Sequence, residues 1–297
     1  MTVLDDLAEV EAIVASARAA QLRFEANGSQ ARYDRAAQAA AWAIMEPSRN
    51  THLAELAVQT TGLGNVPDKI TKNHRKTLGL MRDISTAKTY GIISDNAVTG
   101  ITEIARPIGV IGAVVPSTNP AATPANNIIN ALKCGNAIVL SPSPKGVPAC
   151  EVLIGYIHAE FDKIGEDRDL VQMVQGKGSK EKTQRLLEIS DLIVVTGSQN
   201  NVKRAYTSGT PALAVGAGNV TVIVDETCNL DAAAEKITAS KTFDNATSCS
   251  SENSMVVVEA IYDDFMIALA KAGGARVTDE AAIIAKLWPD GHLNRSV

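Results

Sequence analysis

Short apolar runs alternate with longer amphipathic stretches between residues 107 and 224, and this alternation restricts the fold more than any other feature. The runs IGVIGAVV, NAIVL, DLIVV and NVTVIV have the length and residue types of buried strands, and the segments between them have helical composition. Buried strands separated by helices are typical of a parallel doubly wound sheet. The sequence therefore predicts an α/β fold of Rossmann type, whose ligands bind beyond the carboxyl ends of the strands.

The rest of the chain has a different character on each side of this region. Residues 1–89 are rich in Ala, Leu, Glu, Lys and Arg, which favours helices. Two β-prone segments then flank Asp95 and Asn96, which favours a hairpin. We therefore expect an N-terminal helical part packed on the cofactor domain (1–89), a hairpin that could serve as an oligomerisation ribbon (90–106), a nucleotide-binding domain (107–229) and the beginning of a second α/β domain (230–297).

Charge and hydropathy exclude several classes of partner. Lys and Arg total 28 against 33 Asp and Glu, and the resulting formal charge of −5 has the wrong sign for attraction to nucleic acid or anionic lipid. No run approaches the ~20 consecutive apolar residues that span a bilayer. The first residues carry acids where a secretory signal needs positive charge. We expect a cytoplasmic protein with no nucleic-acid or membrane partner.

The four cysteines lie at irregular spacings, without a CxxC pair or a neighbouring histidine pattern. This spacing indicates neither a metal site nor a disulfide framework. Cys134 and Cys150 lie in apolar stretches and have the pattern of core thiols, whereas Cys228 has that of a loop residue. Cys249 differs, because small polar residues surround it in NATSCSS and leave room for a ligand. Its local pattern suits either a reactive nucleophile or an inert thiol.

The loops that follow the predicted strands contain further candidates, each with two interpretations. Gly176 and Gly178 form only half of a dinucleotide-binding fingerprint and also suit an ordinary strand-to-helix turn. Ser198 could cap a helix, or the helix that it starts could present its N-terminus to a phosphate. Asn119 could donate its side-chain amide to an oxyanion, or form a turn before Pro120. These loops are where we expect a nucleotide to bind.

A set of motifs in fixed order connects these features. The motifs are ARPIGVIGAVVPSTNP, NAIVLSPSPKG, VVTGSQNNVKRAY, PALAVGAGNVTVIVD and SKTFDNATSCSSENSMVVVE. In this order they resemble the aldehyde dehydrogenase superfamily, and specifically its CoA-acylating branch. The stretch TTGLGNVPDKITKNHRK extends the resemblance, so that it covers almost the whole chain. The resemblance implies a Rossmann-type cofactor domain followed by the start of a catalytic α/β domain.

The resemblance also implies roles for individual residues. Cys249 would attack an aldehyde carbonyl, and Asn119 and the main-chain N–H of Cys249 would hold the oxyanion. A hydride would then leave for NAD or NADP, and the thioester on Cys249 would pass its acyl group to CoA. No metal is expected. The implied cofactor-binding residues are Pro116, Ser117, Ser141, Pro142, Ser143, Lys145, Gly178, Thr196, Gly197, Ser198, Val202 and Gly216.

Position 214 departs from the pattern of hydrolytic family members, in which a glutamate acts as general base for water. Ala214 occupies the matching place, 35 residues before Cys249. Because alanine cannot take a proton from water, a thiol such as CoA is the expected acyl acceptor. The loop from Ser141 to Lys145 carries no acid that would repel a 2′-phosphate, so we expect NADP to be tolerated as well as NAD.

The leading interpretation is a CoA-acylating aldehyde dehydrogenase that acts on a small aldehyde. The stretch KNHRKTLGLMRD most resembles enzymes for sulfoacetaldehyde, and acetaldehyde is the alternative substrate. Ala214 disfavours a hydrolytic enzyme. Family members continue well past the position of Val297, so a C-terminally shortened, inactive nucleotide-binding or assembly subunit is the alternative from another class. We expect a homo-oligomer.

Overall fold

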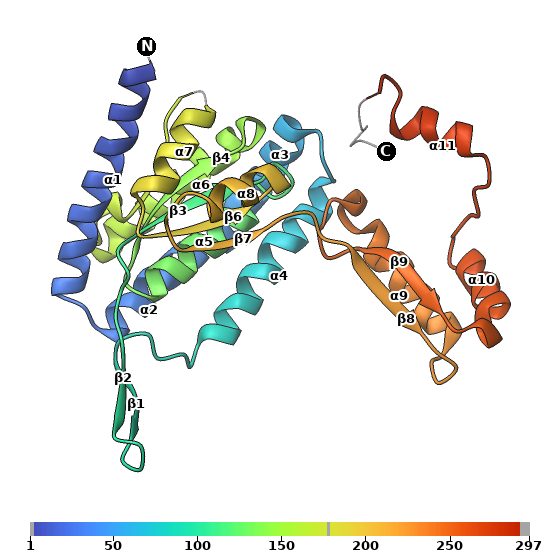
Figure 1. The fold of residues 1–297 in the computed structure, drawn as a ribbon, viewed down its shortest axis with the longest axis horizontal. Helices are drawn as coiled ribbons and strands as arrows, with labels where there is room; N and C mark the ends of the chain where they lie inside the picture. Colours follow the sequence, from blue (N-terminus) through green and yellow to red (C-terminus); the bar gives the residue numbers. More distant parts are fainter. Residues whose placement is uncertain (1–2, 177–178, 292–297) are drawn as a thin grey trace. The chain divides into compact units, whose positions relative to one another are not determined.

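The computed structural model describes residues 3–176 and 179–291. Internal contacts divide the chain into two compact units. Unit 1 consists of residues 1–61 and 69–217, and unit 2 consists of residues 62–68 and 218–297. Figure 1 shows the elements of both units in chain order.

The chain begins with helices whose ends coincide with Gly, Asn and Pro residues in the sequence. Ser29 caps the second helix by accepting a hydrogen bond from the N–H of Arg32, and Pro47 occupies the first position of the third. Gly62 and Gly64 both have positive φ in the connection to the fourth helix, a backbone conformation that favours glycine. The helices are α1 (Val3–Ala26), α2 (Gln30–Met45), α3 (Pro47–Thr61) and α4 (Val66–Ile84).

A parallel sheet forms the centre of unit 1, with the strand order β5-β4-β3-β6-β7. Every neighbouring pair in this sheet is parallel. All residues of β3 and β4 are buried, as expected for central strands covered on both faces. The prediction of a parallel α/β fold is therefore confirmed. The strands are β3 (Val110–Val115), β4 (Ala137–Pro142), β5 (Val171–Met173), β6 (Leu192–Thr196) and β7 (Ala212–Val215).

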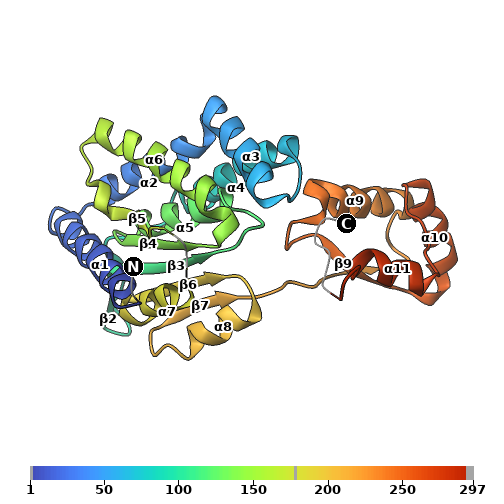
Figure 2. The same ribbon diagram turned by 90° about the horizontal axis from the view of Figure 1, so that it is seen from above.

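Helices cover both faces of the sheet, as Figure 2 shows. Helices α2, α5 and α6 lie on one side, and α1, α7 and α8 lie on the other. Among the residues that the structure describes, no helix is both long enough and apolar enough to cross a membrane. The further elements are α5 (Ala122–Lys133), α6 (Val147–Ile164), α7 (Lys180–Ile189), α8 (Gln199–Tyr206) and the short 3₁₀ helices η1 (Pro144–Gly146) and η2 (Arg168–Leu170).

Asp191 joins the amino ends of β3 and β6 to helix α1. Its Oδ2 accepts hydrogen bonds from the N–H of Val110 and from Arg18 Nη1, both at 2.7 Å. A Cβ on Gly109, whose φ is +131°, would come within 2.2 Å of this oxygen, so the position requires glycine. One carboxylate thus connects the amino ends of β3 and β6 to α1, at the end of the strands opposite the predicted ligand loops.

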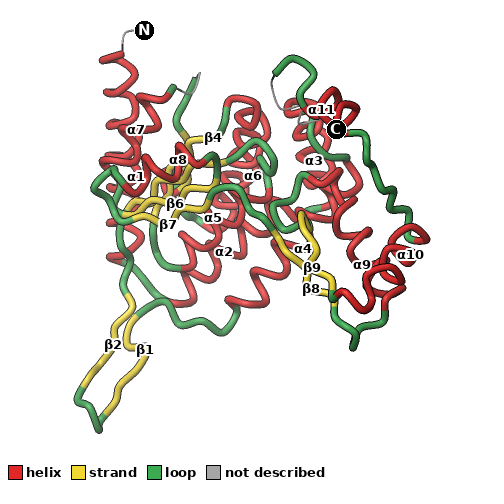
Figure 3. The backbone as a smooth tube through the Cα atoms, turned by 45° about the vertical axis from the view of Figure 1, so that its right-hand side comes forward, coloured by secondary structure: helices red, strands yellow, loops and turns green. Residues whose placement is uncertain are grey.

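An antiparallel hairpin projects from the rest of unit 1, as Figure 3 shows. It consists of β1 (Gly91–Asn96) and β2 (Ile101–Ala105), joined by a turn in which Gly100 has positive φ. All of its strand residues except the two at its base are exposed. Ile92 faces Ile104 across the two strands, and these side chains are 59% and 61% exposed.

Unit 2 contains a parallel strand pair with helices. The nucleotide-binding domain that the sequence predicts over residues 107–229 includes residues 220–224, and in the structure these residues form β8, which pairs with β9 in unit 2. Val224 packs with Ala234, Phe265 and Ala268 in a core separate from that of unit 1. The elements are β8 (Val220–Val224), α9 (Leu230–Thr242), η3 (Phe243–Ala246), β9 (Glu252–Val257), η4 (Glu259–Ile261), α10 (Tyr262–Lys271) and α11 (Glu280–Leu287).

Tyr33 is the largest side chain that is fully buried, and its hydroxyl has no hydrogen-bond partner in the described part of the chain. Its ring packs against Phe24 and Tyr90 at centroid distances of 4.7 and 5.7 Å. A Cβ on Gly28 or on Gly135 would lie within 2.5 Å of Tyr33 atoms, so both glycines make room for this ring. Burial raises the pKa of Tyr33 to about 12.

The pKa of Tyr33 predicts a specific loss of stability at alkaline pH. Because its folded-state pKa exceeds the usual value of about 10, the stability that the neutral phenol contributes is complete below about pH 10 and is lost as the pH rises through about 12. We expect Tyr33→Phe to be at least as stable as wild type at pH 7, because an unpartnered buried hydroxyl is removed. Its stability should fall less than that of wild type between these pH values, as measured by urea denaturation. An identical fall in both proteins would contradict this prediction.

Candidate active site

The loop that carries Cys249 connects α9 to β9 and begins with a left-handed turn. Asp244, Asn245 and Ala246 have φ values of 53°, 52° and 58°. For L-residues this conformation costs roughly 1–2 kcal/mol per residue, and Asn and Asp tolerate it best. Three successive residues in this conformation therefore require stabilising contacts from their surroundings.

Residues 62–68, which belong to the same unit, supply these contacts. Asp244 is fully buried, and its carboxylate accepts hydrogen bonds from the N–H of Asn65 at 3.1 Å and from the hydroxyl of Thr247 at 2.6 Å. The N–H of Asp244 donates to Oδ2 of Asp68 at 2.7 Å. The turn before the candidate nucleophile is thus held by the main chain of Asn65 and the side chain of Asp68, which lie far from it in sequence.

Cys249 is exposed at the end of this loop. The hydroxyls of Ser248 and Ser250 on either side of it are hydrogen-bonded to each other at 2.9 Å. A Cβ on Gly218 would lie 2.8 Å from the carbonyl oxygen of Cys249, so only glycine fits beside this peptide. Within the described residues the N–H of Cys249 donates to no acceptor. One residue therefore presents both an accessible thiol and a main-chain donor.

Asn119 lies in the loop after β3 in unit 1 and is 9% exposed. Its carbonyl accepts a hydrogen bond from the N–H of Thr123 at 3.2 Å, which joins the loop to the start of α5. Its side-chain Oδ1 accepts a hydrogen bond from Lys72 Nζ at 3.0 Å. No group in the described part of the chain accepts a hydrogen bond from Nδ2 of Asn119. The N–H groups of the Asn119 side chain are therefore available to donate to a ligand.

The loops after β3 and β4 lie against each other. The N–H of Ser143 donates to the carbonyl of Val115 at 2.9 Å. A Cβ on Gly146 would lie 3.1 Å from Pro120 and 3.3 Å from Ser143 Oγ. That Oγ atom is buried and has no partner among the described residues. An unpartnered hydroxyl at this point suits a polar ligand group such as a ribose hydroxyl.

Other predicted residues of these loops have different surroundings. Ser141 is 6% exposed, and its hydroxyl pairs with that of Thr183 on α7 at 3.0 Å. Pro142 is buried at the end of β4, so both residues fasten the loop to the fold. Lys145 is exposed, and Pro116 and Ser117 are half-buried. Gly178 lies outside the described residues.

The loops after β6 and β7 also lie side by side. Gly197, which follows the last residue of β6, Thr196, donates its N–H to the carbonyl of Val215 at 3.2 Å. Ser198 caps α8, and a Cβ on Gly216 would lie 2.8 Å from the side chain of Gln199. The first N–H groups of α8 therefore lie beside the ends of both strands, an arrangement that suits a phosphate. Val202 is half-buried on the same helix.

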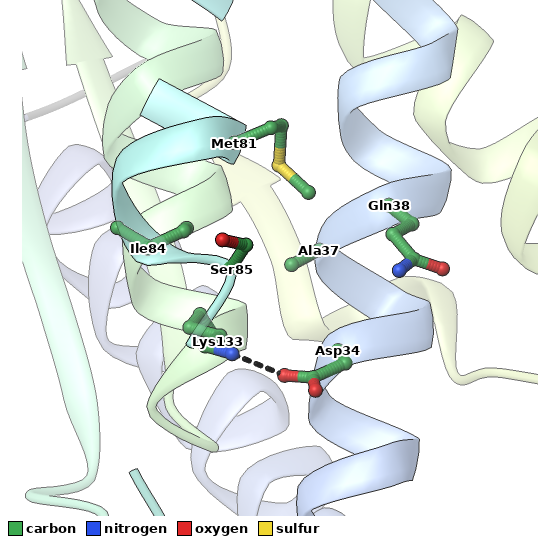
Figure 4. Close-up of a pocket in the computed structure, with 7 residues that line it drawn as sticks. All are labelled: Asp34, Ala37, Gln38, Met81, Ile84, Ser85 and Lys133. Carbon is green, nitrogen blue, oxygen red and sulfur yellow. Dashed lines mark hydrogen bonds and ion pairs between the residues drawn. The ribbon is translucent and has the colours of Figure 1, made fainter. Parts of the chain in front are cut away.

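A cavity of about 140 Å³ lies elsewhere in unit 1, among α2, α4 and α5. Figure 4 shows Lys133 and Asp34 paired in it, with Gln38, Met81 and Ser85 among the other lining residues. None of the predicted site residues lines this cavity. The structure therefore gives no reason to connect this cavity with the predicted chemistry.

The contribution of Lys72, Asp68 and Asp244 was not predicted from the sequence. One signal was present, because Asn65 and Asp68 are spaced as a helix capping pair. In the structure Asn65 Oδ1 accepts from the N–H of Asp68 at 2.9 Å, and Asn65 Nδ2 donates to Asp68 Oδ2 at 2.7 Å. The long-range contacts of these side chains have no comparable local pattern.

Comparison with known proteins gives consistent results. Residues 3–281 match the model of the aldehyde dehydrogenase family. The chain is 59% identical over 286 residues to the sulfoacetaldehyde dehydrogenase (acylating) of Cupriavidus necator, a match that covers 96% of this chain and 58% of that protein. The chain thus spans less than two thirds of the length of this relative.

Solved structures are similar over nearly the whole chain. An acetylating aldehyde dehydrogenase from Geobacillus thermoglucosidasius has a TM-score of 0.91 at 32% identity, over 99% of this chain and 65% of that one. A propionaldehyde dehydrogenase from Rhodopseudomonas palustris, solved with bound CoA and an acylated cysteine, has a TM-score of 0.80 at 30% identity. This second match covers 94% of this chain and 63% of that one.

The surroundings of the cysteines predict an order of reactivity. Cys150 is fully buried, and burial, together with the charge of Glu151, raises its pKa to about 12. Burial also raises the pKa of Cys134. We expect iodoacetamide to label exposed Cys249 before either of these. Labelling of Cys150 should be at least about 100-fold slower, because the fraction of a thiol that is ionised falls about tenfold with each unit by which its pKa rises. Peptide mass spectrometry over time measures the rates, and the unfolded chain is the control. Equal labelling of Cys150 and Cys249 in the folded chain would contradict the prediction.

Proposed function

The chain belongs to the aldehyde dehydrogenase family, and from this premise we propose that it is the cofactor-binding and nucleophile-bearing part of a CoA-acylating aldehyde dehydrogenase. The observation that carries the proposal is the presentation of Cys249, with an exposed thiol and an N–H that has no acceptor within the described residues. An aldehyde that reacts with this thiol would find an oxyanion donor on the same residue.

Cys249 would begin the reaction by attack on the aldehyde carbon, which gives a thiohemiacetal. Its own N–H and the side-chain amide of Asn119 would hold the oxygen that gains charge in this step, and one such donor typically contributes ~10²–10³ in kcat. A bound NAD or NADP would supply the acceptor for the hydride that leaves this carbon, and a proton would leave to solvent. Cys249 is then a thioester, and exchange with the CoA thiol regenerates the free cysteine and releases the acyl-CoA.

Ala214 supports CoA rather than water as the acyl acceptor. The residue lies in β7, and its carbonyl accepts a hydrogen bond from Tyr206 Oη at 3.2 Å. Its methyl side chain has no group that can take a proton, so this position supplies no base to water. This feature disfavours the hydrolytic alternative.

The loops of unit 1 fit a nicotinamide dinucleotide. Ser143 Oγ is buried without a partner in the described residues and suits a ribose hydroxyl, and the N-terminus of α8 beside Thr196 and Gly197 suits the pyrophosphate. No acid lies in the segment from Ser141 to Lys145, which favours tolerance of NADP as well as NAD. The hydroxyl of Ser141 pairs with Thr183, so its role would be to hold this loop.

Sulfoacetaldehyde is the favoured aldehyde. The identity of 59% to an enzyme named for this substrate supports it, and so does the resemblance of the stretch KNHRKTLGLMRD. Acetaldehyde is the alternative. The second candidate function is a nucleotide-binding or assembly subunit without turnover.

Reduction of NAD or NADP by the purified chain tests this proposal. We expect turnover of sulfoacetaldehyde that requires CoA and exceeds turnover of acetaldehyde. Cys249→Ser should reduce kcat by at least about 10³-fold, because it removes the nucleophile. Cys134→Ser is the matched control and should retain activity.

The outcomes separate the candidates. Turnover without CoA would favour a hydrolytic enzyme, and cofactor binding without turnover of either aldehyde would favour the subunit. Activity retained in Cys249→Ser would exclude the assigned nucleophile.

We also propose that the β1–β2 hairpin joins this chain to a second copy of itself. A lone two-stranded ribbon is marginally stable in water, and its edges offer unpaired backbone groups. Ile92, Ile101 and Ile104 are each about 60% exposed, which is a large apolar surface for such a small element. Burial of these side chains against another copy would stabilise both hairpins.

Removal of two apolar side chains from the hairpin tests this contact. The double variant Ile92→Ser/Ile104→Ser should shift the mass measured by light scattering toward the monomer at equal protein concentration. Leu22→Ser is the control, because Leu22 is also 59% exposed but lies on α1. An unchanged mass in the hairpin variant, or a monomeric wild type, would contradict the proposal.

A further inference from the structure

Two lysines of helix α4 are buried beside the loop that follows β3. Lys69 and Lys72 are each 3% exposed, although lysine is almost never fully buried unless its charge is paired. They are three residues apart and therefore lie on the same side of the helix. Lys69 Nζ donates to the carbonyl oxygen of Thr118 at 3.3 Å, and Lys72 Nζ donates to Oδ1 of Asn119 at 3.0 Å. The two ammonium groups thus bind adjacent residues through different kinds of atom.

The bond from Lys72 determines the orientation of the Asn119 amide. An asparagine side chain has an oxygen that accepts and a nitrogen that donates, and the two ends are nearly equal in shape. An ammonium group has only donors, so the end of the amide that faces Lys72 must be the oxygen. A rotation of the amide by half a turn would bring two donors together in a buried place. The donor end of Asn119 is therefore directed away from Lys72.

Lys72 also changes the strength of that donor. A hydrogen bond from a cation is roughly twice as strong as a neutral one. It draws electron density from the amide oxygen, and hydrogen bonds in a chain strengthen one another by about 10–30% per bond. The N–H groups of Asn119, which donate to no acceptor in the described residues, become better donors as a result.

Helix α4 is hydrogen-bonded to helix α3 close to Lys72. Asn73, the next residue, is 4% exposed, and its Nδ2 donates to Asn50 Oδ1 at 3.0 Å. Asn50 Nδ2 in turn donates to the carbonyl of Ile70 at 3.0 Å, so α3 and α4 are joined by two hydrogen bonds. These contacts limit the movement of the helix that carries Lys72.

We propose that Lys72 is a positioning residue, which orients and polarises the Asn119 amide so that its N–H groups hold the oxyanion formed at the aldehyde carbon. This inference rests on the proposed function, because it assumes that Asn119 is an oxyanion donor. Lys72 acts through Asn119 and touches neither thiol nor aldehyde in this proposal. The proposed role of Lys72 consists of hydrogen bonding alone and adds no chemical step to the reaction.

The kinetic test compares single and double variants. Asn119→Ala should lower kcat by about 10²–10³-fold, with a much smaller effect on KM. Lys72→Met should lower kcat by about 10-fold or more, and Lys72→Arg, which keeps the charged donor, should recover most of the loss. The double variant Asn119→Ala/Lys72→Met should be no slower than Asn119→Ala, because both changes remove the same interaction.

Lys69→Met is the matched control. Lys69 is equally buried on the same helix but donates to a main-chain carbonyl, so its loss should leave kcat within about threefold of wild type and should affect stability instead. Lys72→Gln serves as the uncharged variant if Lys72→Met does not fold. The rate of alkylation of Cys249 should be the same in all folded variants.

Nuclear magnetic resonance supplies a measurement that does not depend on turnover. The side-chain ¹⁵N–¹H signals of Asn119, identified by their loss in Asn119→Ala, should move in Lys72→Met and stay in place in Lys69→Met.

The outcomes distinguish this inference from the proposed function. Absence of turnover in the wild type is a failure of the proposed function and removes the oxyanion on which this inference depends. With an active wild type, unchanged amide signals in Lys72→Met overturn the inference alone. The inference is also overturned if the fold-losses in kcat of Asn119→Ala and Lys72→Met multiply in the double variant, because the two side chains would then act independently.

Discussion

Strand β3 is hydrogen-bonded to β4 on one side and to β6 on the other, and this parallel register determines where the ligand loops of unit 1 lie. Val115 is paired with Pro142, and Val114 with Val195, so the three strands end at nearly the same level. The loops with Asn119, Ser143 and Gly197 must then leave the sheet at one edge, whatever their own sequences. At the opposite end of these strands, Asp191 connects the amino ends of β3 and β6 to α1 through two hydrogen bonds. The position of the candidate cofactor site is therefore a consequence of strand pairing, and the chemistry of the site depends on which side chains the loops carry.

Helix α4 contributes to both units, since its first residues belong to unit 2 and the remainder to unit 1. Asp68 accepts the N–H of Asp244 and so supports the left-handed turn before Cys249, whereas Lys72, one helical turn later, supports Asn119. In both cases a charged side chain, half-buried for Asp68 and buried for Lys72, holds a polar group that the reaction would use or depend on. Burial makes such bonds strong, and it also makes them costly to break, because the remaining partner is left unsatisfied. Substitutions in this short segment are therefore expected to affect chemistry more than their distance in sequence from Cys249 suggests.

Patterns with local causes could be predicted from the sequence, and contacts between distant residues could not. The continuous apolar runs of β3 and β4 predicted buried parallel strands, and both strands are fully buried. The small residues around Cys249 indicated room for a ligand, and the thiol is exposed.

The pairing of β8 with β9 was not foreseen, because nothing in an apolar strand specifies its neighbour. Lys72 was not foreseen either, since a lysine in a helical pattern is normally assigned to the surface. The positive φ of Ala246 has no local signal, because alanine carries no side-chain group that could favour it.

The proposed reaction requires a choice between water and CoA as the acceptor of the acyl group, and the acid strengths of the two acceptors explain how this site would make it. Water is a far weaker acid than a thiol, so it needs a base to become a useful nucleophile. A thiol has a pKa of about 8.5, so a few per cent is already thiolate at neutral pH. Donors such as the N–H of Cys249 and the Asn119 amide stabilise the oxyanion for either acceptor and cannot discriminate between them. Discrimination must then come from the missing base at Ala214, which leaves hydrolysis unassisted and does not impede a thiol. A site with strong oxyanion donors and no base is thus selective for thiol acceptors through the identity of one side chain.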